Sequence, residues 1–162
     1  MIVTNILSSQ IKRAEQLYPF TKLKGSITNG KSNIFGALGE IIIYDFFIKN
    51  GYNVNFFSTY NYDLIINDYK VDVKTKKTSV KPQINYLCSI SSYNTVQKCD
   101  YYFFVRIKED MKKGFLLGYL SKKEFFQKSI FKNKNDKDIN GWKFKDDCYN
   151  IEISKLHKFS IK

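Results

Sequence analysis

The sequence has few of the residues that build zinc sites and disulfide frameworks, and it lacks the long apolar runs of membrane spans. Its 3 cysteines lie far apart and it has 1 histidine. No zinc-ligand spacing can therefore be assembled, and buried, reduced thiols are expected. No apolar run approaches the roughly 20 residues that span a bilayer. The first residues, Met1 to Asn5, lack the features of a signal peptide. We therefore expect a soluble, cytoplasmic protein without a membrane partner.

Proline and acidic residues are also scarce. The 162 residues include only 2 prolines and no Pro/Gly/Ser-rich linker, so one domain spanning residues 1–162 is expected. A hydrophobic content of 43% indicates a globular core. Lys and Arg number 27 against 15 Asp and Glu, which gives a net charge of +12. Such a charge attracts polyanions such as nucleic acid. A lysine excess also follows from an AT-rich genome, and the charge alone does not separate these explanations.

Hydrophobic periodicity predicts a mixed α/β domain with a central sheet. A helix is expected from Ser32 or Asn33 through Ile48, closed by Asn50-Gly51, and its apolar surface predicts burial on all sides. The sequence Ser121-Lys122-Lys123-Glu124 matches a capping box and predicts a helix that continues through Ile130. Further helices are expected near 11–18 and 93–98, and strands at 52–56, 63–66, 69–75, 84–90, 101–105, 115–120 and 149–153.

The pair Asn67-Asp68 predicts a tight β-hairpin that brings two carboxylates together. With a two-residue loop, Leu64 faces Val71 and Asp63 faces Asp72. Directly opposed side chains have Cβ atoms about 4.5–5.5 Å apart, and like charges in that position destabilise a sheet. A divalent cation between them removes the conflict. Mg²⁺ binds one or two carboxylates together with water and substrate phosphate, so a magnesium site is expected here.

Two further charged residues are expected at the same site. Lys74 projects from the same strand face as Asp72, where its ammonium can hold an attacking water, help to deprotonate it, and stabilise charge on a phosphate. Glu40 lies on the apolar helix, where a carboxylate needs a partner. Close helix packing, permitted by Gly36 and Gly39, would bring it to the metal. Each residue also has an ordinary interpretation. Asp63 could end a turn, Asp72 and Lys74 could lie on a solvated strand face, and Glu40 could form a salt bridge with a lysine. The ordered combination favours the metal site.

The residues Gly36-x-x-Gly39-Glu40, Tyr62-Asp63 and Val71-Asp72-Val73-Lys74-Thr75 resemble the motifs of the PD-(D/E)XK nuclease superfamily. The similarity is to its Holliday-junction resolvase and restriction-endonuclease-like branches, and it covers about residues 33–107. Tyr62 stands where the family name has proline. The resemblance implies an α/β, restriction-endonuclease-like fold, a mixed central β-sheet flanked by helices. It also implies Lys74 as the catalytic lysine and metal ligation by Asp63, Asp72, the backbone carbonyl of Val73 and, directly or through water, Glu40.

The resemblance implies a metal-dependent nuclease that hydrolyses phosphodiester bonds in DNA with Mg²⁺, for which Mn²⁺ would substitute. An endonuclease selective for branched DNA is the finer expectation, and a homodimer would suit the cutting of two strands. The alternatives are a non-catalytic nucleic-acid-binding module of the same fold and a structural or partner-binding protein whose charge is compositional drift. Candidate nucleic-acid contacts, through phosphates or stacked bases, are Lys76, Lys77, Lys81, Tyr60 and Tyr62.

Overall fold

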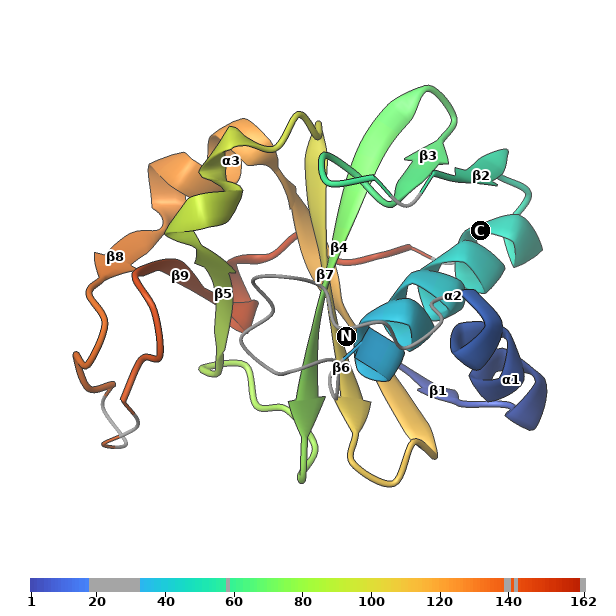
Figure 1. Ribbon diagram of the computed structural model, residues 1–162, viewed down its shortest axis with the longest axis horizontal. Coiled ribbons are helices and arrows are strands. Elements are labelled where there is room, and N and C mark those ends of the chain that lie inside the picture. The colour runs from blue at the N-terminus through green and yellow to red at the C-terminus, as the bar shows by residue number, and fades with distance from the viewer. Residues whose placement is uncertain (18–32, 58, 139–140, 142, 161–162) are drawn as a thin grey trace.

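A six-stranded mixed sheet forms the centre of the protein in the computed structural model, which describes residues 1–17, 33–57, 59–138, 141 and 143–160 (Figure 1). All neighbouring strands are antiparallel except β4 and β6, which are parallel. In spatial order the strands are β1 (Ile2–Asn5), β7 (Lys113–Ser121), β6 (Tyr101–Lys108), β4 (Tyr69–Thr78), β3 (Leu64–Ile66) and β2 (Val54–Phe56).

Helices α1 (Ser8–Leu17) and α2 (Asn33–Lys49) lie on one side of this sheet, at the right of Figure 1. One hydrophobic core joins α2 to alternate residues of the long strands. It contains Leu38 and Ile41 of α2, Val71 and Val73 of β4, and Phe103 of β6. Residues 37–43 of α2 are buried, and Leu38 and Ile41 have no exposed surface, but residues 44–47 are only partly buried and Ile48 is 45% exposed. The predicted burial on all sides is therefore confirmed only for the middle of this helix.

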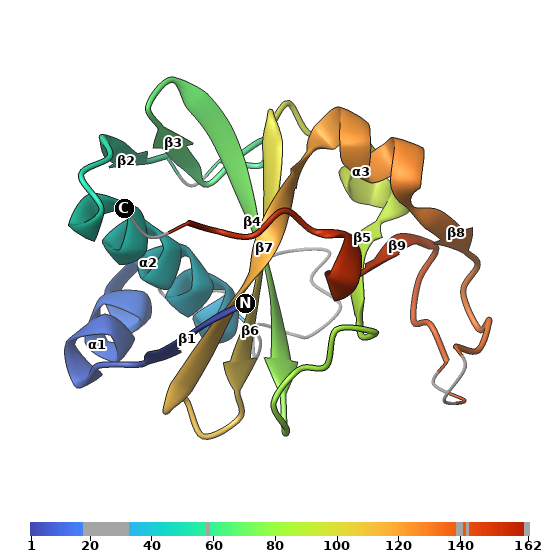
Figure 2. The same cartoon turned by 180° about the vertical axis from the view of Figure 1, so that it is seen from behind.

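A second, three-stranded sheet and a short helix lie on the other side, as the view from behind in Figure 2 also shows. A second hydrophobic core joins Tyr102 and Phe104 of β6 to Phe125, Ile90 and Ile151. Strand β6 is therefore buried on both faces, as its continuous apolar run predicts. The elements on this side are β5 (Leu87–Ser91), η1 (Ser92–Val96), α3 (Lys122–Lys128), β8 (Ile130–Lys132), β9 (Cys148–Glu152) and η2 (Ile153–Lys155).

Several local predictions are confirmed by backbone geometry. Asn67 and Asp68 have φ values of 46° and 43°, the left-handed pair that a two-residue hairpin requires. Gly51 has φ of 80° directly after α2. The capping box is complete, because Ser121 and Glu124 each accept the other's backbone N–H. These features depend on residues close together in sequence, which is why they could be predicted.

Other boundaries were predicted wrongly. The helix after Ser121 was expected to continue through Ile130, but it ends at Lys128, and Ile130 begins strand β8. The expected helix at 93–98 is a single 3₁₀ segment, and strands β1 and β8 were not predicted. Their positions depend on pairing with distant strands, since β1 pairs with β7 and β8 with β9. Within the described residues, no helix is long and apolar enough to cross a membrane. The three cysteines are buried and free.

Candidate active site where strands β3 and β4 separate

The short strand β3 pairs only with the first part of the long strand β4, and within the described residues the same edge of β4 has no partner strand beyond that part. The pairing of β3 with β4 begins at Leu64 opposite Val71. Beyond it, the backbone N–H of Asp63 donates to the Val71 carbonyl at 3.0 Å, and Oδ2 of Asp63 accepts the N–H of Val73 at 2.7 Å. The Asp63 side chain thus takes the place of the missing strand. The Val73 carbonyl points to the same edge of β4 as its N–H, because both groups of one strand residue face the same edge.

Asp72, Lys74 and Gln97 form a closed triangle of polar contacts next to Asp63. Oδ2 of Asp72 lies 2.6 Å from Nζ of Lys74, and Oδ1 accepts Nε2 of Gln97 at 2.9 Å. Nζ of Lys74 donates in turn to Oε1 of Gln97 at 3.1 Å. Asp72 is only 3% exposed, and apart from the ion pair its Oδ2 has no hydrogen-bond partner within the described part of the chain. This oxygen therefore retains coordination capacity.

The two carboxylates resist being ionised together. Burial and, to a lesser extent, the charge of Asp72 together raise the pKa of Asp63 to about 7, although the Val73 N–H and Lys74 partly oppose the shift. Burial also raises the pKa of Asp72, against the opposing effects of Lys74 and Gln97. A divalent cation would stabilise both charged forms. The two adjacent carboxylates of Asp63 and Asp72 and the backbone carbonyl of Val73 match the oxygen ligands that Mg²⁺ uses together with water and phosphate. The residues present therefore fit this metal.

Gln97 was not predicted as a site residue, although the expected helix at 93–98 contained it. It follows the 3₁₀ segment η1 and is buried. Its side-chain Nε2 donates to the Tyr60 backbone carbonyl at 2.8 Å as well as to Asp72. The backbone carbonyl of Gln97 accepts a hydrogen bond from Nζ of Lys122. An amide can donate to a carboxylate and accept from an ammonium at the same time, so glutamine suits a position between Asp72 and Lys74. The only sequence signal was a polar residue shortly before a buried strand.

Glu40 is buried on α2, which packs against the other face of β4. Asp72 and Lys74 project away from the face formed by Val71 and Val73, because side chains alternate along a strand. In the ranges that the structure describes, no three His, Cys, Asp or Glu side chains lie close enough together to hold a metal ion. The role of Glu40 as a ligand therefore stays a prediction.

The two glycines of α2 differ in what surrounds them. An added Cβ at Gly39 would lie 1.9 Å from Oγ1 of Thr75 on β4, so the predicted close approach exists at this position. An added Cβ at Gly36 would meet nothing within 4 Å. The expectation that Gly36 also permits close packing is wrong. Of these two glycines, only Gly39 permits a close approach of α2 to β4 among the described residues.

The candidate nucleic-acid contacts divide between the two faces of the sheet. Lys76 is exposed on the face that carries Asp72 and Lys74. Lys77 projects from the opposite face, where its Nζ lies 3.3 Å from Oε1 of Glu109. Lys81 is exposed beyond the end of β4.

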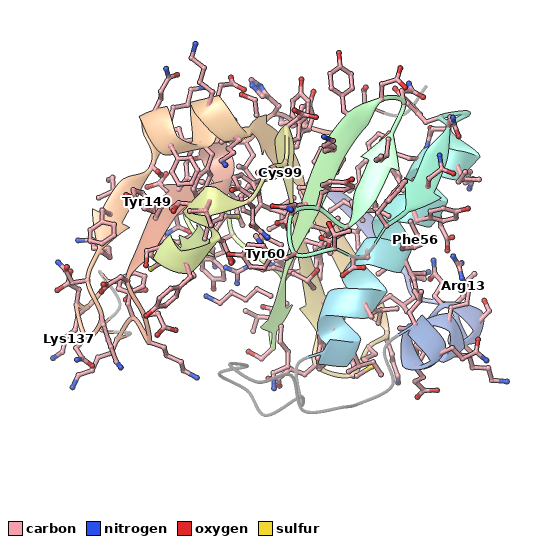
Figure 3. The ribbon with its side chains drawn as sticks, turned by 45° about the horizontal axis from the view of Figure 1, so that its top comes forward. Arg13, Phe56, Tyr60, Cys99, Lys137 and Tyr149 are labelled. Carbon is pink, nitrogen blue, oxygen red and sulfur yellow. The ribbon has the colours of Figure 1, made fainter. Side chains whose placement is uncertain are left out.

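The two candidate tyrosines differ in exposure. Tyr60 is 61% exposed, and its hydroxyl donates to the Tyr93 carbonyl at 2.9 Å. Tyr62 is partly buried against Phe57, with Nζ of Lys70 lying 5.6 Å from its ring centroid. Figure 3 shows Tyr60 near the middle of the molecule, between the helical side and the second sheet. Tyr60 is therefore the better placed of the two to meet a ligand near Gln97.

Comparison of the chain with protein-family models, curated proteins and solved structures finds no match. The function must therefore be inferred from the residues and their geometry.

Proposed function

We propose that this chain is a magnesium-dependent nuclease that hydrolyses phosphodiester bonds in nucleic acid, with DNA as the expected substrate. The observation that carries the proposal is the pairing of the partly buried Asp63 with the buried Asp72, with the Lys74 ammonium 2.6 Å from Asp72. Mn²⁺ is expected to replace Mg²⁺. Endonuclease action on branched DNA, and a homodimer that presents two such sites, are the finer parts of the proposal.

The order of elements around the site supports the proposal. Helix α2 precedes three antiparallel strands, β2, β3 and β4, and β6 then lies parallel to β4. The helix and the order of these strands match the α-β-β-β-α-β core of the PD-(D/E)XK nucleases that the motifs resemble, but β5 and the 3₁₀ segment η1 stand between β4 and β6 where that core has its second helix. The site lies where β3 and β4 separate, so a phosphate could approach the unpaired edge of β4.

The chain's own residues would divide the work of hydrolysis. Asp63, Asp72 and the Val73 carbonyl would hold the cation, which when bound acts as a Lewis acid toward the phosphate. Gln97 orients both Asp72 and Lys74. The Lys74 ammonium would donate to a phosphate oxygen as its charge grows and would orient the attacking water. Water forms the new P–O bond and one ester P–O bond breaks, which leaves a phosphate monoester and a hydroxyl.

A nuclease assay tests the proposal. Purified chain is incubated with plasmid, single-stranded DNA, branched DNA and RNA in the presence of Mg²⁺, Mn²⁺ or EDTA. We expect metal-dependent cleavage that falls by a factor of about 10² to 10³ in Lys74→Ala, because one stabiliser of transition-state charge is removed. DNA binding in EDTA should persist in that variant. Normal cleavage by Lys74→Ala would refute the assigned mechanism.

A non-catalytic nucleic-acid-binding module is the second candidate. It is favoured by the finding that Lys74 already neutralises Asp72 and that the described residues contain no three-acid metal group. Salt-sensitive DNA binding without cleavage of any substrate by either cation would support this candidate over the nuclease.

A further inference from the structure

Two basic side chains lie next to each other on the face that carries Asp72, and they come from neighbouring parallel strands. Lys76 of β4 is directly paired in register with Arg106 of β6. Paired residues of adjacent strands project to the same face, and Lys76 follows Asp72 and Lys74 at two-residue intervals. The two cations therefore extend the line of polar side chains that begins at the candidate active site.

Arg106 is a buried cation for which the described part of the chain supplies no acidic ion-pair partner. It is only 7% exposed, one guanidinium nitrogen donates to the Leu87 carbonyl at 3.0 Å, and the guanidinium lies 5.2 Å from the ring centroid of Tyr86. Within the described residues, neither Arg106 nor Lys76 forms an ion pair with a carboxylate. Burying a cation beside a second one is costly unless an anion compensates it.

Two like charges in register on neighbouring strands repel each other, and the directions of the pKa shifts agree with this. Burial lowers the pKa of Lys76, and Arg106 lowers it further, while Asp138 and the thiols of Cys88 and Cys148 only partly oppose the shift. Burial likewise lowers the pKa of Arg106. Lys76 nevertheless remains open to solvent, so an incoming anion can reach it. The pair would bind an anion that relieves this repulsion.

We propose that Lys76 and Arg106 form a subsite that binds a backbone phosphate of the nucleic-acid strand, next to the phosphate at Asp72 and Lys74. This assignment rests on the proposed function for the identity of the ligand. Alternate strand residues are about 6.6 Å apart, close to the separation of successive phosphates along a nucleic-acid strand. Lys76 contacts the phosphate, and buried Arg106 supplies a fixed positive field behind it.

Binding measured in EDTA tests the subsite without requiring catalysis. The anisotropy of fluorescein-labelled single-stranded and duplex DNA is followed over a range of salt concentrations. The variants are Lys76→Ala, Lys76→Arg and, as a control of equal charge change, Lys12→Ala, which alters an exposed residue of α1. Lys76→Ala should bind about tenfold more weakly, and its salt slope should fall by about 1. Lys76→Arg should restore both values, and Lys12→Ala should match the native chain.

Equal affinities and equal salt slopes for Lys76→Ala and Lys12→Ala would overturn the subsite, even if the chain proves to be a nuclease. Conversely, a selective loss of binding in Lys76→Ala would support the subsite even if no cation promotes cleavage. Arg106→Gln keeps a donor for the Leu87 carbonyl and removes the charge. Native affinity in a folded Arg106→Gln variant would overturn the role of Arg106. Lys76-dependent binding of inorganic phosphate without any contribution to DNA binding would overturn the assignment to a nucleic-acid backbone.

Discussion

Strand β4 presents two different surfaces to its neighbours. Val71 and Val73 face α2 in an apolar core, whereas Asp72 and Lys74 face the side of the second sheet, among polar partners. Burial of the apolar surface stabilises the fold. Burial of the acidic surface costs stability, as the raised pKa values of both carboxylates indicate. Residues adjacent in sequence would therefore serve stability and the proposed function separately.

The largest expected effect is a loss of cleavage in Asp72→Asn, which is compared with a substitution of its neighbour Val71 on the opposite surface. Asp72→Asn should reduce cleavage by a factor of about 10³, as expected when electrostatic stabilisation of the transition state is lost. Its melting temperature should change less than that of Val71→Ala, because the removal of a costly buried charge is offset by the loss of the counter-charge of Lys74. Val71→Ala should lower the free energy of unfolding by about 2 kcal/mol while folded molecules keep their activity. Single-turnover cleavage and thermal melts measure both. Loss of activity in folded Val71→Ala would contradict this separation of β4 into a stabilising face and a catalytic face.

The pH dependence of the free energy of unfolding should show how much ionisation of the Asp63 carboxyl group destabilises the folded chain. Its pKa rises from 3.8 to about 7 on folding. Between these values the folded chain holds a proton that the unfolded chain has released. Without metal, the stabilisation from this group is therefore complete below about pH 4 and is lost as the pH rises through 7. Melts in EDTA should show this loss, and Asp63→Asn should flatten the profile. An unchanged profile in the variant would assign the pH dependence to other groups.

Gly39→Ala tests the apolar side at its closest contact. The new methyl would lie 1.9 Å from Oγ1 and 3.0 Å from Cβ of Thr75, so the helix or the strand must shift. We expect a loss of about 1–3 kcal/mol in the free energy of unfolding, measured by urea denaturation. Gly36→Ala is the matched control, because its added Cβ meets nothing within 4 Å. Part of the loss should be recovered in Gly39→Ala/Thr75→Ala. Equal stability of the two single variants would contradict the contact.

Gln97→Ala should have a smaller effect on activity than loss of a metal ligand. Gln97 lowers the pKa of Asp72 and orients Lys74 without belonging to the predicted ligand set. We expect about tenfold slower cleavage, corresponding to about 1.4 kcal/mol, and an acidic limb of the pH–rate profile that moves to higher pH. A purely structural role would change the melting temperature and leave that limb in place. Comparison of the two profiles decides between them.

The smallest effect is expected from Lys77→Ala. This residue lies on the α2 side of β4 and forms an ion pair with Glu109, so DNA affinity should change by less than about twofold. Lys76→Ala removes the same charge from the other face. Anisotropy titrations on both variants compare them directly. A larger loss for Lys77 than for Lys76 would show that the nucleic acid follows the opposite face.

Sequence reasoning reached the parts of the candidate site that depend on short-range geometry. A two-residue turn at Asn67-Asp68 was enough to place Asp63 near Asp72, and strand alternation was enough to place Lys74 beside it. Gln97 could not be placed in this way. Its contacts with Asp72 and Tyr60 join residues separated by 25 and 37 positions, and the path of the chain between them depends on how β5 and η1 pack. A count of charges does not distinguish Lys76 from Lys77. They differ in the face of β4 from which their side chains project.

The sequence by itself determined the alternation along β4, the hairpin, the capping box and the apolar helix, because each depends on residues a few positions apart. Only the tertiary structure decided that α2 packs on the valine face, that Gln97 joins Asp72 to Lys74, and that Arg106 lies beside Lys76. Those contacts depend on which distant strands and helices are neighbours in space. That choice is made by the burial of two whole hydrophobic cores and not by any local pattern.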